Sequence, residues 1–177
     1  MIMDDKTIKV LYEREEIQTR VEETSKKINN EYSKDENIII ICLLKGGFIF
    51  TSDLVRYMKR NVQIEFMVVS SYEDAEESSG KVNVKLDVEC DIEGQNVIIV
   101  DDIVDTGNTL HAIKEMLLSR NPKSLKTCCL LDKEERRVKD IDVDYCVLKC
   151  PNKFVIGYGM DAASKFRNLP YVGYIEQ

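Results

Sequence analysis

The stretch NVIIVDDIVDTGNTLHAIKEMLL, residues 96–118, decides the fold. It opens with four apolar and largely β-branched residues, 97–100, in a run too short for a helix, which predicts a strand buried on both faces. A polar stretch with three aspartates follows. Apolar residues then recur with helical spacing at Leu110, Ile113 and Leu117. The segment is therefore predicted to form a strand, a polar loop and a helix.

The loop before this helix has the composition of a phosphate site. A helix that starts after a buried strand leaves backbone N–H groups unpaired, and these groups together with the helix dipole favour an anion. Thr106 and Thr109 add hydroxyl donors, and Gly107 lets the backbone approach a ligand closely. Because Asp101 and Asp102 repel phosphate, we expect them to hold sugar hydroxyls or a magnesium ion. The sequence thus predicts a sugar phosphate as the ligand.

Threonine and aspartate at this position could also act only as helix caps, but a cap does not require three aspartates in five positions. Residues 97–110 resemble the phosphoribosyl pyrophosphate signature of the type I phosphoribosyltransferases. The resemblance implies an α/β fold with a mostly parallel central sheet flanked by helices, a small hood and a flexible flap loop. It also implies a purine salvage enzyme that transfers the phosphoribosyl group from phosphoribosyl pyrophosphate to N9 of hypoxanthine, and of guanine.

Composition limits the alternatives. A chain of 177 residues with 44% hydrophobic residues can build one sizeable core, so a single domain over residues 1–177 is expected. The net charge of -7 argues against a nucleic-acid or anionic-membrane partner. No long apolar segment or signal-peptide core is present, which favours a cytoplasmic protein. The six cysteines lack the spacing of a metal site, so reduced thiols are expected.

A second strand, loop and helix precede the first. Residues 13–31 have the pattern of an amphipathic helix, and Ile38–Leu44 follows as a buried strand. Lys45 and Gly46 come next, before an apolar helical stretch over residues 48–58. The lysine and glycines could form only a tight turn. The resemblance implies instead that Lys45 and Gly46 bind pyrophosphate, after a cis peptide bond between Leu44 and Lys45.

A long polar stretch separates two further predicted strands. Residues 64–69 read as a strand, and alternating apolar residues from Val82 to Val88 read as a half-exposed strand. The segment between them could be disordered, or it could be a lid that keeps water from a reactive sugar. We favour a flap loop over residues of about 70–88. The resemblance places Ser71 and Tyr72 in the part that closes over pyrophosphate.

The final third of the chain is expected to hold the purine. Residues 125–131 predict a strand, and Lys133 follows its end, where ligands collect in open α/β sheets. A lysine there could also be a solvated turn residue. The resemblance implies that Lys133 donates to the 6-oxo group, that Phe154 stacks on the base and that the backbone of Val155 reads its edge. Residues of about 144–177, with short strands at 144–148, 154–156 and 171–175, are expected to form the hood together with N-terminal residues.

The resemblance also assigns the remaining roles. Asp105 is expected to be the general base, or the hydrogen-bonding partner, of purine N7. Arg167 is expected to face pyrophosphate, and a homodimer or homotetramer is implied. Asp101, Asp102 and Asp161 are expected to hold Mg²⁺. The phosphoribosyl pyrophosphate site is expected to comprise Asp101, Asp102, Ile103, Val104, Asp105, Thr106, Gly107, Asn108 and Thr109.

Two other classes of protein compete with this interpretation. A regulator could use the same fold to sense nucleotides and bind RNA, which the acidic composition disfavours. A receiver-like signalling domain also carries an acidic pair at a strand end, but it needs a separate phosphoacceptor aspartate, and Lys45 occupies the nearest candidate position. Within enzymes, the preference among hypoxanthine, guanine and xanthine stays open.

Overall fold

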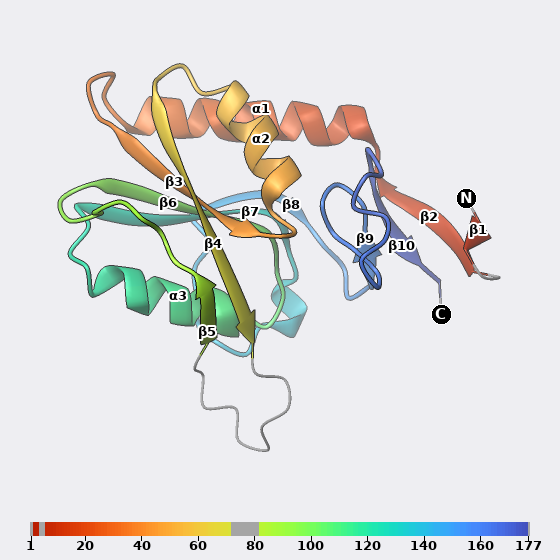
Figure 1. Cartoon of the computed structure of the whole chain (residues 1–177). Coiled ribbons are helices and arrows are strands. Elements are labelled where there is room, and N and C mark those ends of the chain that lie inside the picture. Colours follow the sequence, from red (N-terminus) through yellow and green to blue (C-terminus); the bar gives the residue numbers. More distant parts are fainter. Residues whose placement is uncertain (1, 4–5, 72–81, 177) are drawn as a thin grey trace.

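A six-stranded sheet forms the main layer of the protein in a computed structural model that describes residues 2–3, 6–71 and 82–176 (Figure 1). Its order is β5-β4-β3-β6-β7-β8, and every neighbouring pair is parallel except β4 and β5. The strands are β3 (Ile38–Leu44), β4 (Val62–Ser71), β5 (Val82–Leu86), β6 (Asn96–Val104), β7 (Ser124–Asp132) and β8 (Tyr145–Lys149). This mostly parallel sheet confirms the predicted fold class.

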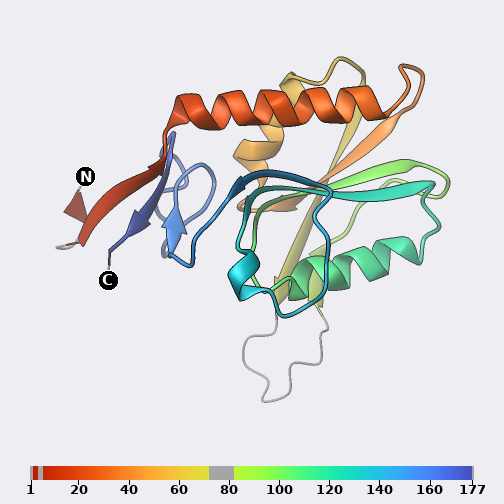
Figure 2. The ribbon, with the colours of Figure 1, turned by 180° about the vertical axis from the view of Figure 1, so that it is seen from behind.

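Helices cover both faces of the sheet. Helices α1 (Arg14–Glu31) and α2 (Phe48–Arg56) lie on one face, and α3 (Asn108–Leu118) lies on the other (Figure 2). The first core includes Ile17, Val21 and Ile28 of α1, Phe50 and Leu54 of α2, and Ile38, Ile40, Ile98 and Val100 of the sheet. The second includes Ile39, Ile41, Leu43, Val97 and Ile99 of the sheet with Leu110, Ile113 and Leu117 of α3. Alternate residues of β3 and β6 thus enter opposite cores, as predicted for strands buried on both faces.

The longest helix, α1, is amphipathic. Its buried residues include Ile17, Val21 and Ile28, and the rest of its surface is largely charged. This is the stripe predicted from the sequence, with the helix beginning at Arg14 and ending at Glu31. Among the helices of the described segments, none joins the length to the apolarity that crossing a bilayer requires.

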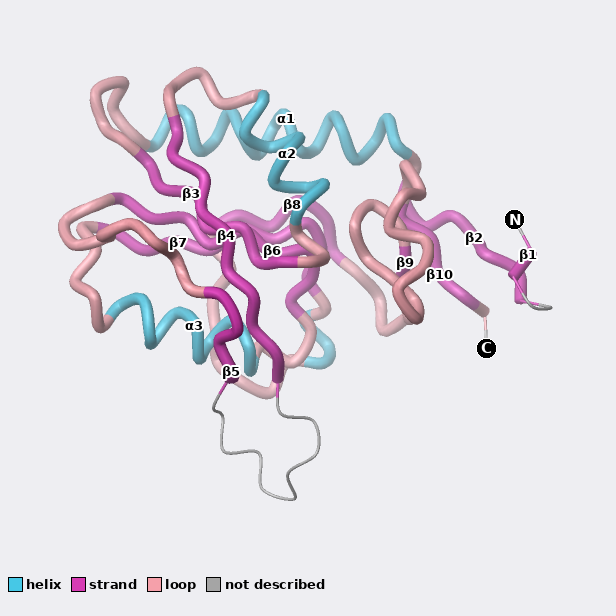
Figure 3. Tube along the Cα trace, viewed as in Figure 1, coloured by secondary structure: helices cyan, strands magenta, loops and turns pink. Residues whose placement is uncertain are grey.

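A second, smaller sheet stands beside the first and contains both ends of the described chain (Figure 3). Its order is β1-β2-β10-β9, all antiparallel, with β1 (Ile2–Met3), β2 (Lys6–Tyr12), β9 (Val155–Ile156) and β10 (Val172–Ile175). This sheet corresponds to the expected hood. One difference concerns residues 144–148, which we expected in the hood. They form most of β8, which pairs with β7 in the large sheet. The C-terminal part of the chain therefore adds strands to the hood only from Val155 onward.

Strand β6 is longer than the apolar run predicts. We expected the polar loop to start at Asp101, but β6 continues to Val104, so both aspartates lie within the strand. The reason is the ladder with β7, in which Asp101 pairs with Cys129 and Val104 pairs with Asp132. The loop before α3 is therefore only Asp105, Thr106 and Gly107.

Candidate active site

Three strands bring the predicted site residues to one edge of the sheet. Because β3, β6 and β7 are parallel, the segments that follow them, beginning at Lys45, Asp105 and Lys133, lie at the same edge (Figure 1). The hood faces this edge and closes a cavity of about 860 Å³. Seven of the predicted residues line that cavity: Asp102, Ile103, Asp105, Lys133, Phe154, Val155 and Asp161.

The loop before α3 forms a smaller hollow of about 150 Å³. Gly107 takes a left-handed conformation with φ of 83°, which ends the strand and starts the helix. The N–H of Asn108, the first residue of α3, donates to Oγ1 of Thr106 at 3.4 Å, and the N-cap residue Gly107 has no side chain that could cap the rest of the first turn. The carbonyl of Thr106 accepts hydrogen bonds from the N–H groups of Val138 and Lys139, at 2.9 and 3.2 Å. The loop is thus held in place beside the N-terminus of α3, where free N–H groups and the helix dipole suit a phosphate.

Asp101 and Asp102 form a repulsive pair at the end of β6. Each carboxylate accepts a hydrogen bond from the N–H of the next residue, at 3.0 Å. Burial and the charge of Asp102 raise the pKa of Asp101 well above its usual value, and burial also raises the pKa of Asp102. A ligand that offers hydroxyl donors or positive charge would stabilise this pair.

The loop after β3 closes tightly on Asp102. The Leu44–Lys45 peptide bond is cis, which confirms the expectation from the family resemblance. A Cβ atom on Gly46 would lie only 1.7 Å from Oδ2 of Asp102. A Cβ atom on Gly159, in the hood, would lie 2.1 Å from the carbonyl oxygen of Gly46. Glycine at both positions therefore lets the loop, the acid pair and the hood meet.

Asp105 lies between two cations. Its Oδ2 is 3.6 Å from Nζ of Lys133, and its Oδ1 is 3.1 Å from Nε of Arg136. Oδ1 is nevertheless buried and accepts no hydrogen bond from the described residues, because the Arg136 contact is an ion pair without hydrogen-bond alignment. Lys133 is only 5% exposed, whereas the side chain of Asp105 is 35% exposed. The carboxylate thus keeps acceptor capacity at the wall of the cavity.

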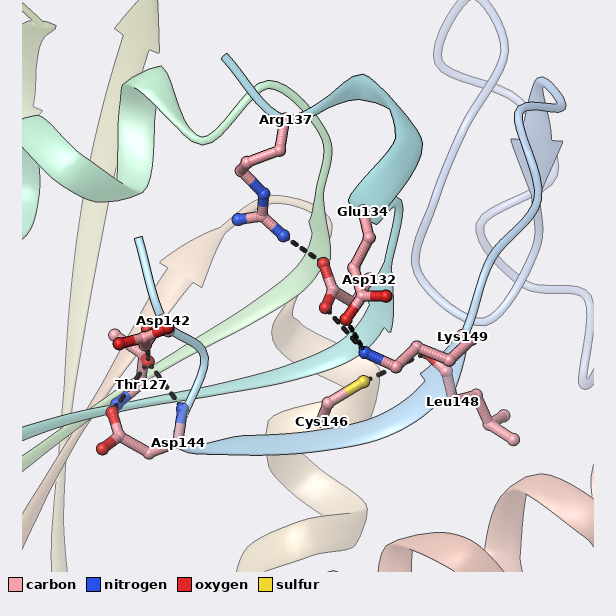
Figure 4. A network of polar contacts seen from close by, with 9 residues as sticks. All are labelled: Thr127, Asp132, Glu134, Arg137, Asp142, Asp144, Cys146, Leu148 and Lys149. Carbon is pink, nitrogen blue, oxygen red and sulfur yellow. Dashed lines mark hydrogen bonds and ion pairs between the residues drawn. The ribbon is translucent and has the colours of Figure 1, made fainter. Parts of the chain in front are cut away.

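A buried ion network holds the end of β7 in place (Figure 4). Asp132 is 4% exposed and pairs with Arg137 on one oxygen and with Lys149 on the other, the latter at 3.2 Å. Lys149 also pairs with Glu134. Arg137 therefore points inward, toward Asp132 and Gly107. The network fixes the backbone on both sides of Lys133.

The hood supplies the opposite wall. Phe154 is 53% exposed and Val155 is buried, and both line the cavity. Arg167 pairs with Asp161 at 2.6 Å and donates to the carbonyl of Gly159 at 2.7 Å. Asp161 also accepts a hydrogen bond from the N–H of Ser164 at 2.7 Å. In this arrangement Arg167 and Asp161 hold each other at the rim of the cavity.

A magnesium ion at the end of β6 would have two protein carboxylates as ligands. No group of three or more metal-ligating side chains gathers among the residues that the structure describes. The paired carboxylates of Asp101 and Asp102, however, are oxygen donors whose mutual repulsion a divalent cation would relieve. Mg²⁺ commonly binds one or two carboxylates together with water and substrate phosphates, so such a pair is sufficient.

Sequence reasoning missed several residues that line the cavity, among them Arg136. Arg136 lines the cavity and contacts Asp105, but in the sequence it belongs to the charged run EERRVKD, which has the composition of a solvated surface. In the flap, Ser71 is the last residue of β4, and Tyr72 lies outside the described residues.

Comparison with known proteins shows close relatives over almost the whole chain. The family model of the phosphoribosyl transferase domain matches residues 8–163. The hypoxanthine-guanine phosphoribosyltransferase of Aquifex aeolicus is 47% identical, and the match covers 97% of this chain and 96% of the relative. The hypoxanthine phosphoribosyltransferase of Buchnera aphidicola is 43% identical, with 96% of each chain covered. A crystal structure of a hypoxanthine-guanine phosphoribosyltransferase from Bacillus anthracis superposes with a TM-score of 0.92 at 42% identity, covering 96% of this chain and all of the other.

Proposed function

The chain belongs to the phosphoribosyltransferase family, and from this premise we propose that it transfers the phosphoribosyl group from phosphoribosyl pyrophosphate to N9 of hypoxanthine, and of guanine. The proposal rests on the position of the hollow before α3, which adjoins the larger cavity. The hollow before α3 and the larger cavity share Asp105 and Ile103 as lining residues. A ligand with a 5′-phosphate in the hollow and a base in the cavity therefore has its sugar beside the acid pair.

The purine binds between Lys133 and Phe154. Lys133 donates to the 6-oxo group, and its near-complete burial gives this contact selectivity. An adenine amino group would face the ammonium donor to donor, at a cost of about 1–3 kcal/mol for the unsatisfied groups. Phe154, exposed to the cavity, stacks on the ring, and the backbone of Val155 reads its edge.

Phosphoribosyl pyrophosphate binds along the strand ends. The segment from Thr106 to Thr109 holds the 5′-phosphate, and Asp101 and Asp102 hold the ribose hydroxyls. Lys45, Gly46 and Arg167 lie toward the pyrophosphate. When bound by the acid pair, and by Asp161 in a second site, Mg²⁺ supplies positive charge that stabilises the departing pyrophosphate.

In this reaction the protein places N9 of the purine against the anomeric carbon and supplies no nucleophile of its own. The bond from the anomeric carbon to pyrophosphate breaks, and the bond to N9 forms, through a ribosyl cation-like transition state. Asp105 accepts the hydrogen of N7 through Oδ2, which lies 3.6 Å from Nζ of Lys133 and so stays free to bind the purine. A flap over residues of about 70–88 that excludes water stays a prediction, because residues 72–81 lie outside those that the structure describes. Ser71 and Tyr72 belong to that flap.

A pyrophosphate-release assay with Mg²⁺, phosphoribosyl pyrophosphate and one purine at a time tests the function. Hypoxanthine and guanine should support turnover, and adenine should not; absence of turnover with every 6-oxopurine would overturn the proposal. Asp105→Asn should lower kcat more than about 100-fold with little change in KM for phosphoribosyl pyrophosphate. If kcat fell and KM for phosphoribosyl pyrophosphate rose by the same factor, Asp105 would have no specific role in the chemical step.

The remaining expectations follow from the same premise. The alternative RNA-binding regulator has no support from the relatives, which carry enzyme names. Six free cysteines, four of them buried, suit the reducing environment of the cytoplasm. A homodimer or homotetramer stays a prediction, which light scattering on the purified protein would test.

A further inference from the structure

We propose that Arg136 is a positioning residue that holds the carboxylate of Asp105 in place for the purine, an inference that rests on the proposed phosphoribosyl transfer. Arg136 ends a 3₁₀ turn, Glu134–Arg136, that follows β7. Within this turn the N–H of Arg136 donates to the carbonyl of Lys133 at 3.1 Å, which folds the chain back over the strand end. The Nε atom of Arg136 consequently lies 3.1 Å from Oδ1 of Asp105.

The need for such a residue follows from the spacing of Lys133 and Asp105. A 6-oxopurine presents O6, an acceptor, beside position 7, and when N7 carries hydrogen the complementary pattern is a donor beside an acceptor. Nζ of Lys133 and Oδ2 of Asp105 offer this pattern at a separation of 3.6 Å. That separation is longer than a hydrogen bond, so both groups stay free to bind the purine.

Two opposite charges at this distance attract each other, and contact between them would block the purine. If the carboxylate turned toward Lys133, the lysine would lose its donor to O6 and the aspartate its acceptor for N7. The ion pair of Arg136 with Oδ1 of Asp105 attracts the carboxylate in the other direction and so opposes this rotation. The side chain of Asp105 is 35% exposed on a short loop, and the described contacts of its carboxylate are these two ion pairs.

Arg136 is not required for the local fold. The 3₁₀ turn is anchored by its neighbours, since Glu134 pairs with Lys149 and Arg137 pairs with the buried Asp132. The side chain of Arg136 is 48% exposed and lines the cavity. Loss of its guanidinium group should therefore change catalysis without changing stability.

The test compares Arg136→Met, which keeps the length of the side chain but not the charge, with Arg136→Lys. We expect kcat/KM for hypoxanthine to fall about tenfold in Arg136→Met, the effect of one lost contact to an ionised group. The KM for phosphoribosyl pyrophosphate and the melting temperature should stay unchanged, and Arg136→Lys should recover part of the activity. Lys139→Met is the matched control, because it removes an exposed positive charge three residues away.

Two further measurements separate positioning from a general loss of charge. A hypoxanthine analogue with carbon in place of N7 cannot use Asp105 and loses only the contact of Lys133 with O6, so its inhibition constant should rise less in Arg136→Met than the KM for hypoxanthine does. In an Asp105→Asn background, Arg136→Met should add almost nothing. Three results would each overturn the role of Arg136. The first is wild-type activity in Arg136→Met, and the second is an inhibition constant of the analogue that rises as much as the KM for hypoxanthine. The third is a fall in kcat/KM as large in the Asp105→Asn background as in the wild type. Lack of turnover in the wild type would instead overturn the proposed function.

Discussion

Replacing Gly46 by alanine tests whether the loop after β3 and the acid pair must be in contact. The new Cβ atom would lie 1.7 Å from Oδ2 and 2.3 Å from Cγ of Asp102. An ordinary contact between such atoms is about 3.4 Å, so the carboxylate and the loop must separate by roughly 1.7 Å in total. The strand end holding Asp102 is fixed by its ladder to β7, and the displacement falls on the side chain or on the loop.

A displacement of this size should damage catalysis much more than folding. Misplacement of a reacting group by about 1 Å can cost about 100-fold in rate, which corresponds to about 2.7 kcal/mol of transition-state stabilisation. We therefore expect Gly46→Ala to lower kcat/KM for phosphoribosyl pyrophosphate by about 100-fold or more. Pyrophosphate release measures this loss, and circular dichroism melting shows whether the variant still folds.

Gly94→Ala is the matched control. It makes the same chemical change at a turn residue with φ of 67°, where no atom lies within 4 Å of the new Cβ. It should cost about 1 kcal/mol of stability through backbone strain and leave kcat/KM unchanged. If Gly46→Ala kept kcat/KM within about threefold of the wild type while Gly94→Ala behaved as expected, the contact between Gly46 and Asp102 would not matter for function.

Three further predictions concern the acid pair and the hood. Burial and the charge of Asp102 raise the pKa of Asp101, so the folded protein keeps a proton that the unfolded chain releases. The free energy of unfolding should therefore fall as the pH rises from about 4, near the pKa of an unfolded aspartate, through the raised pKa of the folded protein. Asp101→Asn should reduce this fall, and Asp102, whose pKa burial also raises, should account for the rest. The variant should also add about 1 kcal/mol of stability at pH 7 and raise KM for phosphoribosyl pyrophosphate, as urea melts at several pH values and kinetics would show. Phe154→Ala should raise KM for hypoxanthine about tenfold by loss of stacking but cost less than about 1 kcal/mol in a thermal melt, because the ring is 53% exposed. Tyr158→Phe removes the hydrogen bond from the buried Tyr158 hydroxyl to Asp53 and should lower the urea midpoint by the equivalent of about 1–3 kcal/mol; an unchanged midpoint would contradict this.

The sequence was sufficient where one physical pattern determined the structure. Apolar runs such as Ile38–Leu44 predicted buried strands, because few other structures hide four or more consecutive apolar residues. The order of strand, polar loop and helix predicted the sheet edge where Lys45, Asp105 and Lys133 now lie. The conformation of Gly107 also agrees with the loop that its position suggested.

The sequence was insufficient where a partner element determined the outcome. Asp101 and Asp102 are polar, yet they belong to β6 because β7 extends far enough to pair with Asp101, Ile103 and Val104. Residues 144–148 are as short a run as the hood strands, and only their pairing with β7 shows that they belong to the large sheet. Arg136 and Arg137 are adjacent and alike in the sequence, but the 3₁₀ turn sends one to the cavity and the other to Asp132.

The backbone bonds that join the loop before α3 to the segment after β7 have a consequence for ligand length. Lys133 donates its N–H to the carbonyl of Val104 at 2.9 Å, and Val138 donates to that of Thr106, also at 2.9 Å. Backbone hydrogen bonds thus join the loop proposed to bind the 5′-phosphate to the segment proposed to bind the purine. Because these bonds hold the distance between the two segments constant, we expect the site to bind a nucleoside monophosphate more tightly than analogues that are one methylene longer or shorter.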